Sequence, residues 1–488
     1  MEEKFATVLL HNQDWRIRYN RYFYTAKEIV MLVTGIKNTI NAKVYDKGKY
    51  FIAIGFNSFE YFIYIMLASS LGFKVILCDP KMLKTLLHHY KLNYGGILST
   101  RQIDTQGIRY IKLNMNNILM TDVSDIDVDS TQAELLFFTS GTTNLPKLVV
   151  YQENTLLKNA RIVGHYLGIQ KRDRCVCLFP THYMYGFSTL MSTLLYSGEI
   201  ILERPTITAQ EIWSYLIKDN IRFLPLLRSF VEELKPLIES QHLYFENLTI
   251  LNASDCIYQH HVHDILSICP AFWNNFGQTE SGPRIFTLQI NHRIMNQSAL
   301  YSQSGVVALG KPVDPTIHIA ILNEEGKECD TPEIGELYYQ SPFRMEGYLD
   351  TDGSLISKNQ IASGDLVYRN EDGNVCWVGR KNEIVKINGK YMNIGLLHQY
   401  FDSVDGVKKS YFIYDDKKGL FGFFVMDNLH SENDIKDKII SLYKQRFPTY
   451  PRICRLIAVE EIPSTLSGKT KYSSLRNMDF SLLGMAYV

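Results

Sequence analysis

The stretch from Lys49 to Pro80 constrains the fold more than any other part of the chain. An apolar run, YFIAIGF, is followed by NSFEYFIYIMLASSLG and then by FKVILCDP. We predict two buried strands joined by a helix that begins after Asn57 or Ser58 and ends at Gly72, because Asn and Ser cap helices and glycine ends them. Strand, helix and strand within about 30 residues form a crossover unit, which predicts a parallel sheet.

The same alternation recurs between residues 155 and 202 and between 210 and 251, where Thr208 is the expected cap of an amphipathic helix. From about 305 to 380 short strands separated by turn residues indicate an antiparallel β subdomain. A helix capped by Ser431 is expected in the tail. The chain is therefore predicted to be α/β, with a large N-terminal domain of parallel α/β subdomains plus a β subdomain (1–380) and a small α+β C-terminal domain (381–488).

Charge and hydropathy exclude several classes of protein. The chain has 51 basic and 51 acidic residues, so its net charge favours neither nucleic acid nor an anionic membrane. The longest uncharged apolar segment, YFIYIMLASSLGF, is too short for a membrane span, and the first residues lack a secretory signal. Eight scattered cysteines without a CxxC pair indicate buried, reduced thiols. We expect a cytoplasmic protein.

A loop rich in hydroxyl groups separates two apolar runs in FFTSGTTNLPKLVVY, residues 137–151. Small donors, a glycine that lets backbone approach a ligand, and one cation together suit a polyphosphate. On its own, the loop is also compatible with a solvated Ser/Thr turn. The candidate phosphate-binding residues are Thr139, Ser140, Gly141, Thr142, Thr143 and Lys147.

This loop resembles the signature of the adenylate-forming superfamily, which includes acyl-CoA synthetases, nonribosomal peptide adenylation domains and luciferases. Asn144 and Leu148 replace two glycines of the family's pattern. Four further stretches resemble family motifs in the same order: NNFGQTESG, ASGDL, VGRKNEIVKINGK and IPSTLSGKTKYSSL. Other departures are Asn382 at the position of the family's hinge residue and Tyr472 where a basic residue is common.

The resemblance implies an ATP-dependent carboxylic acid:thiol ligase that forms an acyl-adenylate and releases pyrophosphate. Its C-terminal domain is mobile in the family and rotates between the two half-reactions. The implied roles are adenine stacking on Phe276 beside Gly277, ribose binding by Asp365, ribose or phosphate binding by Arg380, AMP contact by Lys386, α-phosphate binding by Thr279, Mg²⁺ binding by Glu280 and transition-state stabilisation by Lys469.

The substrate and the acceptor are less closely defined. Tyr183, or its neighbour His182, stands where members that activate amino acids carry an aspartate, and Ala253 and Ser254 replace a Gly-Gly pair. Without a carboxylate for an ammonium group, an apolar or aromatic acid is expected. Arg204 and the loop at Gly389 are candidates for contact with CoA or phosphopantetheine.

Three interpretations remain open at this point. The leading one is an acyl- or aryl-CoA synthetase. The second is a stand-alone adenylation enzyme that loads a separate phosphopantetheine carrier protein. The third is a catalytically degenerate nucleotide-binding protein, suggested by the replaced motif residues.

Overall fold

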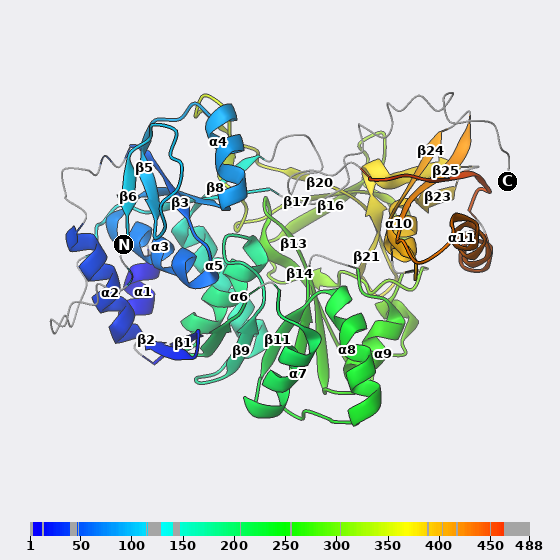
Figure 1. The fold of residues 1–488 in the computed structure, drawn as a ribbon, viewed down its shortest axis with the longest axis horizontal. Helices are drawn as coiled ribbons and strands as arrows, with labels where there is room; N and C mark the ends of the chain where they lie inside the picture. Colours follow the sequence, from blue (N-terminus) through cyan, green and yellow to red (C-terminus); the bar gives the residue numbers. More distant parts are fainter. Residues whose placement is uncertain are drawn as a thin grey trace.

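The fold is known from a computed structural model. It describes residues 3–11, 14–39, 46, 48–113, 115, 128–139, 147–204, 206–253, 256–302, 304–387, 390–402, 404–415, 418–448 and 450–462. Two large mixed sheets and a smaller antiparallel sheet are the main sheets of this part of the chain, and the last elements gather at the end of the molecule opposite the N-terminus (Figure 1).

The first large sheet has nine strands in the described residues, with parallel strands at its centre and the antiparallel strands β14, β15 and β2 at its edges. Its order is β15 (Lys311–Pro312), β14 (Gly282–Asn291), β13 (Ala271–Gln278), β12 (Thr249–Asn252), β11 (Phe223–Leu226), β9 (Arg174–Cys177), β10 (Glu199–Leu202), β1 (Arg16–Tyr19) and β2 (Tyr22–Thr25).

The second large sheet has eight strands in the same described part, with a parallel centre. Its order is β19 (Leu355–Ile356), β18 (Gly347–Leu349), β8 (Leu148–Gln152), β7 (Glu134–Phe138), β4 (Lys74–Cys78), β3 (Tyr50–Ile54), β5 (Tyr94–Ser99) and β6 (Tyr110–Lys112).

Helices cover both large sheets, and one buried cluster joins side chains of the two sheets with those of α1, α2, α3, α5 and α6. The helices are α1 (Phe5–His11), α2 (Ala26–Thr39), α3 (Ser58–Leu71), α4 (Leu83–His89), α5 (Glu153–Leu167), α6 (Met184–Leu195), α7 (Ala209–Lys218), α8 (Arg228–Gln241), α9 (Gln259–Leu266), α10 (Gly395–Phe401) and α11 (Glu432–Arg446), with short 3₁₀ turns η2 (Pro80–Met82), η3 (Ser298–Leu300) and η4 (Lys381–Glu383).

The remaining strands form three small antiparallel or mixed sheets. The predicted β subdomain is the antiparallel sheet of β16 (His318–Leu322), β17 (Gly335–Gln340), β20 (Ile361–Arg369) and β21 (Val375–Arg380). After η4 come the pair β22 (Ile384–Ile387) and β23 (Lys390–Asn393), then β24 (Val407–Asp415), β25 (Gly419–Met426) and β26 (Ile453–Ala458). This part lies beside α10 and α11 (Figure 1).

Local predictions of helix ends are confirmed. α3 has Asn57 as its N-cap, bonded to the amide of Glu60, and Gly72 as a left-handed C-cap. Thr208 caps α7 in a capping box, and Ser431 caps α11. β3 and β4 pair in parallel around α3, as the crossover unit requires. None of the helices in the described part of the chain combines the length and apolar character that crossing a membrane requires.

Candidate active site

The hydroxyl-rich loop leaves the sheet between the antiparallel strands β7 and β8. Two hydrogen bonds close its base: the Thr139 amide donates to the Lys147 carbonyl at 2.9 Å, and the Lys147 amide donates to Thr139 Oγ1 at 3.2 Å. Thr139 is buried and Lys147 is exposed. The predicted phosphate-binding residues Ser140, Gly141, Thr142 and Thr143 lie outside the described residues.

Lys147 is connected to Glu280 through a tyrosine. Its Nζ lies 4.7 Å from the centroid of the Tyr348 ring, and the Tyr348 hydroxyl donates to Glu280 Oε1 at 3.0 Å. Burial and the Glu280 carboxylate raise the pKa of Tyr348, so its hydroxyl stays a donor. Tyr348 reaches this position because β18 pairs with β8 next to the loop.

The turn that carries Thr279 and Glu280 follows directly after β13. Buried Tyr151 donates its hydroxyl to the Thr279 carbonyl at 2.8 Å, and the amide of Met345 donates to the Glu280 carbonyl at 3.0 Å. The Gln278 amide donates to Ser281 Oγ at 2.8 Å. These bonds fix the backbone of the turn. The side chains of Thr279 and Glu280, predicted to act on phosphate and metal, therefore start from defined backbone positions.

Gly277 occupies an irregular pairing of β13 with β14, where the register shifts between Phe276 and Gln278. A Cβ atom at Gly277 would lie 2.3 Å from the carbonyl oxygen of Pro283. Glycine is therefore required for the two backbones to approach this closely. Phe276 is half-buried and packs edge-on against Phe286, with ring centroids 5.9 Å apart.

Asp365 is a buried carboxylate, 1% exposed, with several donors around it. Gln278 Nε2 donates to Oδ2 at 2.8 Å, Trp377 Nε1 donates to Oδ1 at 3.0 Å, and Arg380 Nε lies 3.2 Å from Oδ1. Burial raises the pKa of Asp365, although Arg380 and Trp377 act in the opposite direction. β20 and β21 place Asp365 and Arg380 directly opposite each other.

Gln278 unites two predicted motifs, because it comes from the NNFGQTESG stretch and bonds Asp365 of the ASGDL stretch. The strands that carry them, β13 and β20, lie near each other at the centre of the molecule (Figure 1). Arg380 has a half-exposed side chain and also donates to the Ser363 carbonyl at 3.1 Å.

Two of the C-terminal candidates lie on described residues. Lys386 is exposed on β22, and its Nζ lies 5.0 Å from the centroid of the Tyr391 ring on β23. Asn382 belongs to the 3₁₀ turn η4. Gly389 and Lys469 lie outside the described residues, so their predicted roles stay predictions.

The candidate acid-binding residues lie at two element ends. His182 is buried between the rings of Tyr61 and Tyr183, at 4.5 and 4.3 Å, whereas Tyr183 at the start of α6 is 43% exposed. Burial lowers the pKa of His182 to about 4, against the effect of Asp79 at 3.8 Å, so the ring is neutral at pH 7. Ala253 is buried after β12, and Ser254 lies outside the described residues.

Arg204 is an exposed residue just before α7, and its guanidinium donates to Glu211 Oε1 at 2.8 Å. Glu211 also uses Oε2 to accept from the amide and the hydroxyl of Thr208, which completes the helix cap. Arg204 therefore already has an ion-pair partner, and its predicted contact with CoA stays a prediction.

Sequence reasoning missed four residues of this region: Tyr151, Tyr348, Trp377 and Arg284. Tyr348 lies in a GYL stretch that resembles the family weakly, which was the available signal. The other three become visible only through contacts with other elements: Tyr151 with the turn after β13, Trp377 with β20, and Arg284 with α5 and α6. Arg284, on β14, is fully buried, and no feature of the sequence around it indicates burial of a cation.

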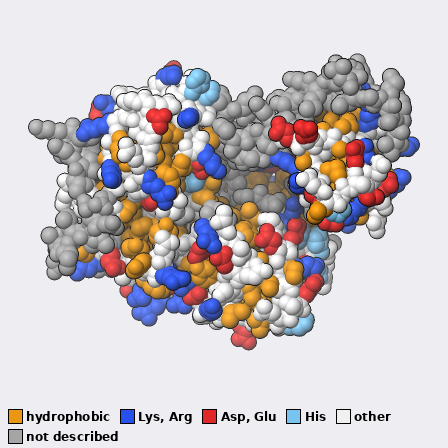
Figure 2. All heavy atoms as spheres, in the orientation of Figure 1, with side chains coloured by type: hydrophobic (Ala, Val, Ile, Leu, Met, Phe, Trp, Pro, Cys, Tyr) orange, Lys and Arg blue, Asp and Glu red, His pale blue; other side chains and the backbone are white. Residues whose placement is uncertain are grey.

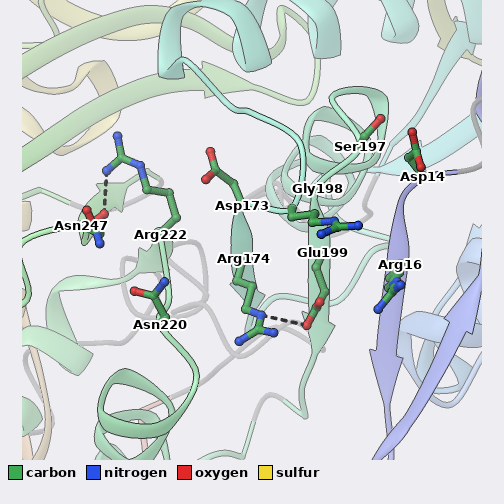
Figure 3. A pocket seen from close by; sticks show the side chains of 11 residues that line it. Asp14, Arg16, Asp173, Arg174, Ser197, Gly198, Glu199, Asn220, Arg222 and Asn247 are labelled. Atoms are coloured by element: carbon green, nitrogen blue, oxygen red, sulfur yellow. Dashed lines mark hydrogen bonds and ion pairs between the residues drawn. The ribbon is translucent and has the colours of Figure 1, made fainter.

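A hollow of about 610 Å³ lies at a different place, where the strands β1, β9, β10 and β11 begin (Figure 3). Four arginines and three carboxylates line it, and Arg174 pairs with Glu199 at 3.2 Å. In a parallel sheet all strands begin at one edge and end at the opposite edge. This hollow lies where strands begin, so it is separate from the residues that follow the ends of β12 and β13. On the face shown in Figure 2, basic and acidic side chains are interspersed.

The described residues contain no group of three or more His, Cys, Asp or Glu side chains that could hold a metal ion. One carboxylate, Glu280, is nevertheless a suitable ligand for Mg²⁺, because this ion is commonly bound by one or two carboxylates together with phosphate oxygens and water. One of its oxygens accepts the Tyr348 hydroxyl. The donor set therefore fits an ion that arrives with a polyphosphate.

The model of the family described as AMP-binding enzyme matches residues 100–349, just over half of the chain. The chain belongs to this family, which confirms the predicted membership of the adenylate-forming superfamily. It is similar to a nonribosomal peptide synthetase, flvI, of Aspergillus flavus, with 24% identity over 76% of this chain and 37% of the relative. It is also similar to a probable CoA ligase, CCL5, of Humulus lupulus, with 23% identity over 70% of this chain and 63% of the relative.

The chain thus spans less than two thirds of the length of either relative. Among solved structures, the fold is similar to that of o-succinylbenzoate CoA synthetase (MenE) of Bacillus subtilis in complex with the acyl-adenylate OSB-AMP. That match has a TM-score of 0.79 and 17% identity, and covers 98% of this chain and 99% of the other. It confirms the predicted α/β fold class.

Proposed function

We propose that the protein is an ATP-dependent carboxylic acid:thiol ligase that works through an acyl-adenylate. The observation that carries this proposal is the contact of Lys147, Tyr348 and Glu280, three residues far apart in sequence, at the base of the hydroxyl-rich loop. Gln278 extends the same group to Asp365. These contacts support one continuous site for phosphate, metal and ribose, as an adenylating enzyme requires.

In the first half-reaction a carboxylate oxygen of the acid attacks the α-phosphorus of ATP. The bond to the bridging oxygen breaks, pyrophosphate leaves, and the acid becomes a mixed anhydride with AMP. In the second, a thiol attacks the acyl carbon, a thioester forms and AMP leaves. Because the protein forms no covalent bond to the substrate, its contribution is positioning and neutralisation of charge.

The placement of the residues supports the following roles. Phe276 offers a partly exposed ring for adenine, and Asp365 has lone pairs left beyond its protein donors for the ribose hydroxyls. Lys147 stands at the loop base for the β- and γ-phosphates, and Thr279 for the α-phosphate. Glu280 would hold Mg²⁺, which neutralises phosphate charge. Lys469, carried by a mobile domain 381–488, would approach the α-phosphate.

For the acid, a neutral His182 and the partly exposed Tyr183 support an aromatic or apolar body next to α6. For the thiol, CoA and a phosphopantetheine carrier protein are both proposals, since relatives of both kinds are similar to the chain. Activity in the cytoplasm is part of the same proposal.

The test is a hydroxamate-trapping and pyrophosphate-release screen over aryl, short-chain and long-chain acids, with free CoA present or absent. We expect acyl-adenylate from at least one acid, abolished in Lys469→Ala and Asp365→Ala. Lys327→Ala, an exposed turn residue paired with Glu325, is the matched control and should leave the rate unchanged.

Thioester formation with free CoA supports the CoA ligase, and adenylate that is consumed only with a carrier protein supports the stand-alone adenylation enzyme. ATP binding without adenylate from any acid would instead support a degenerate nucleotide-binding protein.

A further inference from the structure

Arg284 is a fully buried cation whose partners are all neutral. Its guanidinium donates to Thr189 Oγ1 at 3.0 Å and to the Tyr166 hydroxyl at 3.5 Å, and its Cζ lies 5.2 Å from the centroid of the Tyr185 ring. No Asp or Glu among the described residues forms an ion pair with it. Among the described residues, Arg284 Nε and the Oγ of Ser188, which precedes Thr189 on α6, have no hydrogen-bond partner.

This arrangement is unfavourable for the protein alone. A guanidinium does not lose its proton under physiological conditions, so it cannot escape the cost of burial by becoming neutral. Burying a charge without a counter-charge is costly, and hydroxyl groups compensate only part of that cost. A buried arginine that lacks a carboxylate partner is therefore a place where an anion would bind strongly.

The position of Arg284 connects it to the proposed site. In the pairing of β13 with β14, Phe276 faces Phe286 and Gln278 faces Gly282, so Arg284 lies opposite the irregularity at Gly277. It comes four residues after Glu280 in sequence.

The residues around Arg284 extend toward the other candidate acid-binding positions. The Tyr166 hydroxyl donates to Asn275 Oδ1 at 2.6 Å, next to Phe276. The Tyr185 hydroxyl donates to the Leu251 carbonyl at 3.1 Å, two residues before Ala253, and Tyr185 itself follows Tyr183 by two residues on α6. Arg284 therefore lies among the elements that carry the predicted acid-binding residues.

We propose that Arg284 is a specificity-determining residue that binds a second anionic group of the acid, so that the substrate is a dicarboxylic acid. One carboxylate would be activated at the α-phosphate, and the distal one would pair with Arg284 beside Thr189. This inference rests on the proposed function and narrows its substrate class. The other interpretation is that Tyr166, Thr189 and the Tyr185 ring hold Arg284 as a purely structural cation.

The experiment compares dicarboxylic acids with their monoamides, which have the same shape but lack the distal charge. Succinate, glutarate, adipate and the phthalate isomers are titrated by calorimetry into the wild-type protein and into Arg284→Met and Arg284→Lys. Arg222→Met is the matched control: Arg222 also donates to neutral oxygens, Asn247 O and Thr249 Oγ1, at 2.7 Å, but lies where β11 begins (Figure 3). Thermal melting establishes that each variant is folded.

We expect at least one diacid to bind the wild type at least about 30-fold more tightly than its monoamide, as for other buried charge pairs. The ratio should fall to about threefold or less in Arg284→Met, be partly kept in Arg284→Lys and be unchanged in Arg222→Met. A wild type that does not prefer any diacid overturns the inference, whether or not Arg284→Met folds. So does a preference that survives in Arg284→Met.

Pyrophosphate release measured with the same acids separates the two proposals. Diacid binding that depends on Arg284 without adenylate formation from any acid contradicts the proposed function and the activation of a diacid, and leaves Arg284 as an anion-binding residue only. Adenylation of monocarboxylic acids with no advantage for diacids contradicts the inference and leaves the proposed function standing.

Discussion

Asp365 and Arg284 are both buried charges near the end of β13, but their surroundings differ. Asp365 has a cation, Arg380, at 3.2 Å and two further donors, Gln278 and Trp377. Arg284 has hydroxyl groups and an aromatic ring. The protein compensates the first charge itself, and we propose that the substrate compensates the second. The comparison teaches that burial alone does not identify a binding residue; the deficit of compensating charge does.

The largest expected effect comes from removing the Asp365 carboxylate, and Arg284→Met is the contrasting variant. Asp365→Ala should lower the free energy of unfolding by about 2–4 kcal/mol, because Trp377, Gln278 and Arg380 lose their acceptor. Arg284→Met should change it by less than about 1 kcal/mol, because an uncompensated charge is replaced by an apolar chain of similar length. Chemical denaturation measures both. An equal loss in the two variants would make Arg284 a structural residue and end the contrast.

A third buried group, His182, differs from Asp365 and Arg284 because it can become neutral. Its pKa is lowered to about 4 by burial, below the ordinary value of 6.5, so the folded state binds fewer protons than the unfolded state between these pH values. The wild type should therefore lose up to about 3 kcal/mol of stability from this residue as the pH falls from 7 to 4.

The matched variant is His182→Phe, which keeps a ring between Tyr61 and Tyr183. We expect the difference in unfolding free energy between pH 7 and pH 4.5 to be smaller in this variant than in the wild type. The same acid sensitivity in both proteins would show that His182 is not held neutral by burial.

Gly277 lies between the surroundings of Asp365 and those of Arg284. In Gly277→Ala the added Cβ would meet Pro283 O at 2.3 Å, so β14, which carries Arg284, must move away from β13. Such crowding should cost about 1–3 kcal/mol of stability, with a fall in adenylation. Gly168→Ala is a contrasting variant, since its left-handed φ of 65° strains Ala although nothing lies within 4 Å of its Cβ position, so it should lose stability without a fall in adenylation. A fall in adenylation no larger in Gly277→Ala than in Gly168→Ala would argue against close packing at the bulge.

The smallest effect on catalysis is expected at Tyr348. Tyr348→Phe keeps the ring beneath Lys147 and removes only the hydroxyl that donates to Glu280. This change should weaken the binding of ATP by about 1 kcal/mol. The measurement is the KM for ATP in the pyrophosphate assay. Tyr338→Phe removes a comparable bond to Glu336 and should leave that KM unchanged. Indistinguishable variants would mean that the tyrosine does not orient Glu280.

Features decided by neighbouring residues could be predicted from the sequence. The caps at Asn57, Thr208 and Ser431 and the C-cap at Gly72 depend on local backbone chemistry, and all four are confirmed. The α/β fold class followed from the alternation of predicted strands and helices, and the family followed from motifs in the right order.

Features decided by contacts between distant strands could not be predicted. The bond from Gln278 to Asp365 joins residues 87 positions apart, and the one from Tyr348 to Glu280 joins residues 68 apart. An arginine in a strand that otherwise reads GPRIFTLQIN looks like a surface residue, and only packing against α5 and α6 buries Arg284. His182 and Tyr183 were candidates for one role, yet the first is buried and the second half-exposed.

The carboxylate of Glu211 divides its two oxygens between separate tasks, since Oε1 pairs with Arg204 and Oε2 secures the start of α7. An incoming phosphate group would therefore be able to recruit the arginine without unwinding the first turn of that helix. A ligand that binds at Arg204 would therefore have to replace only one exposed ion pair, and the backbone around Arg204 would not have to change.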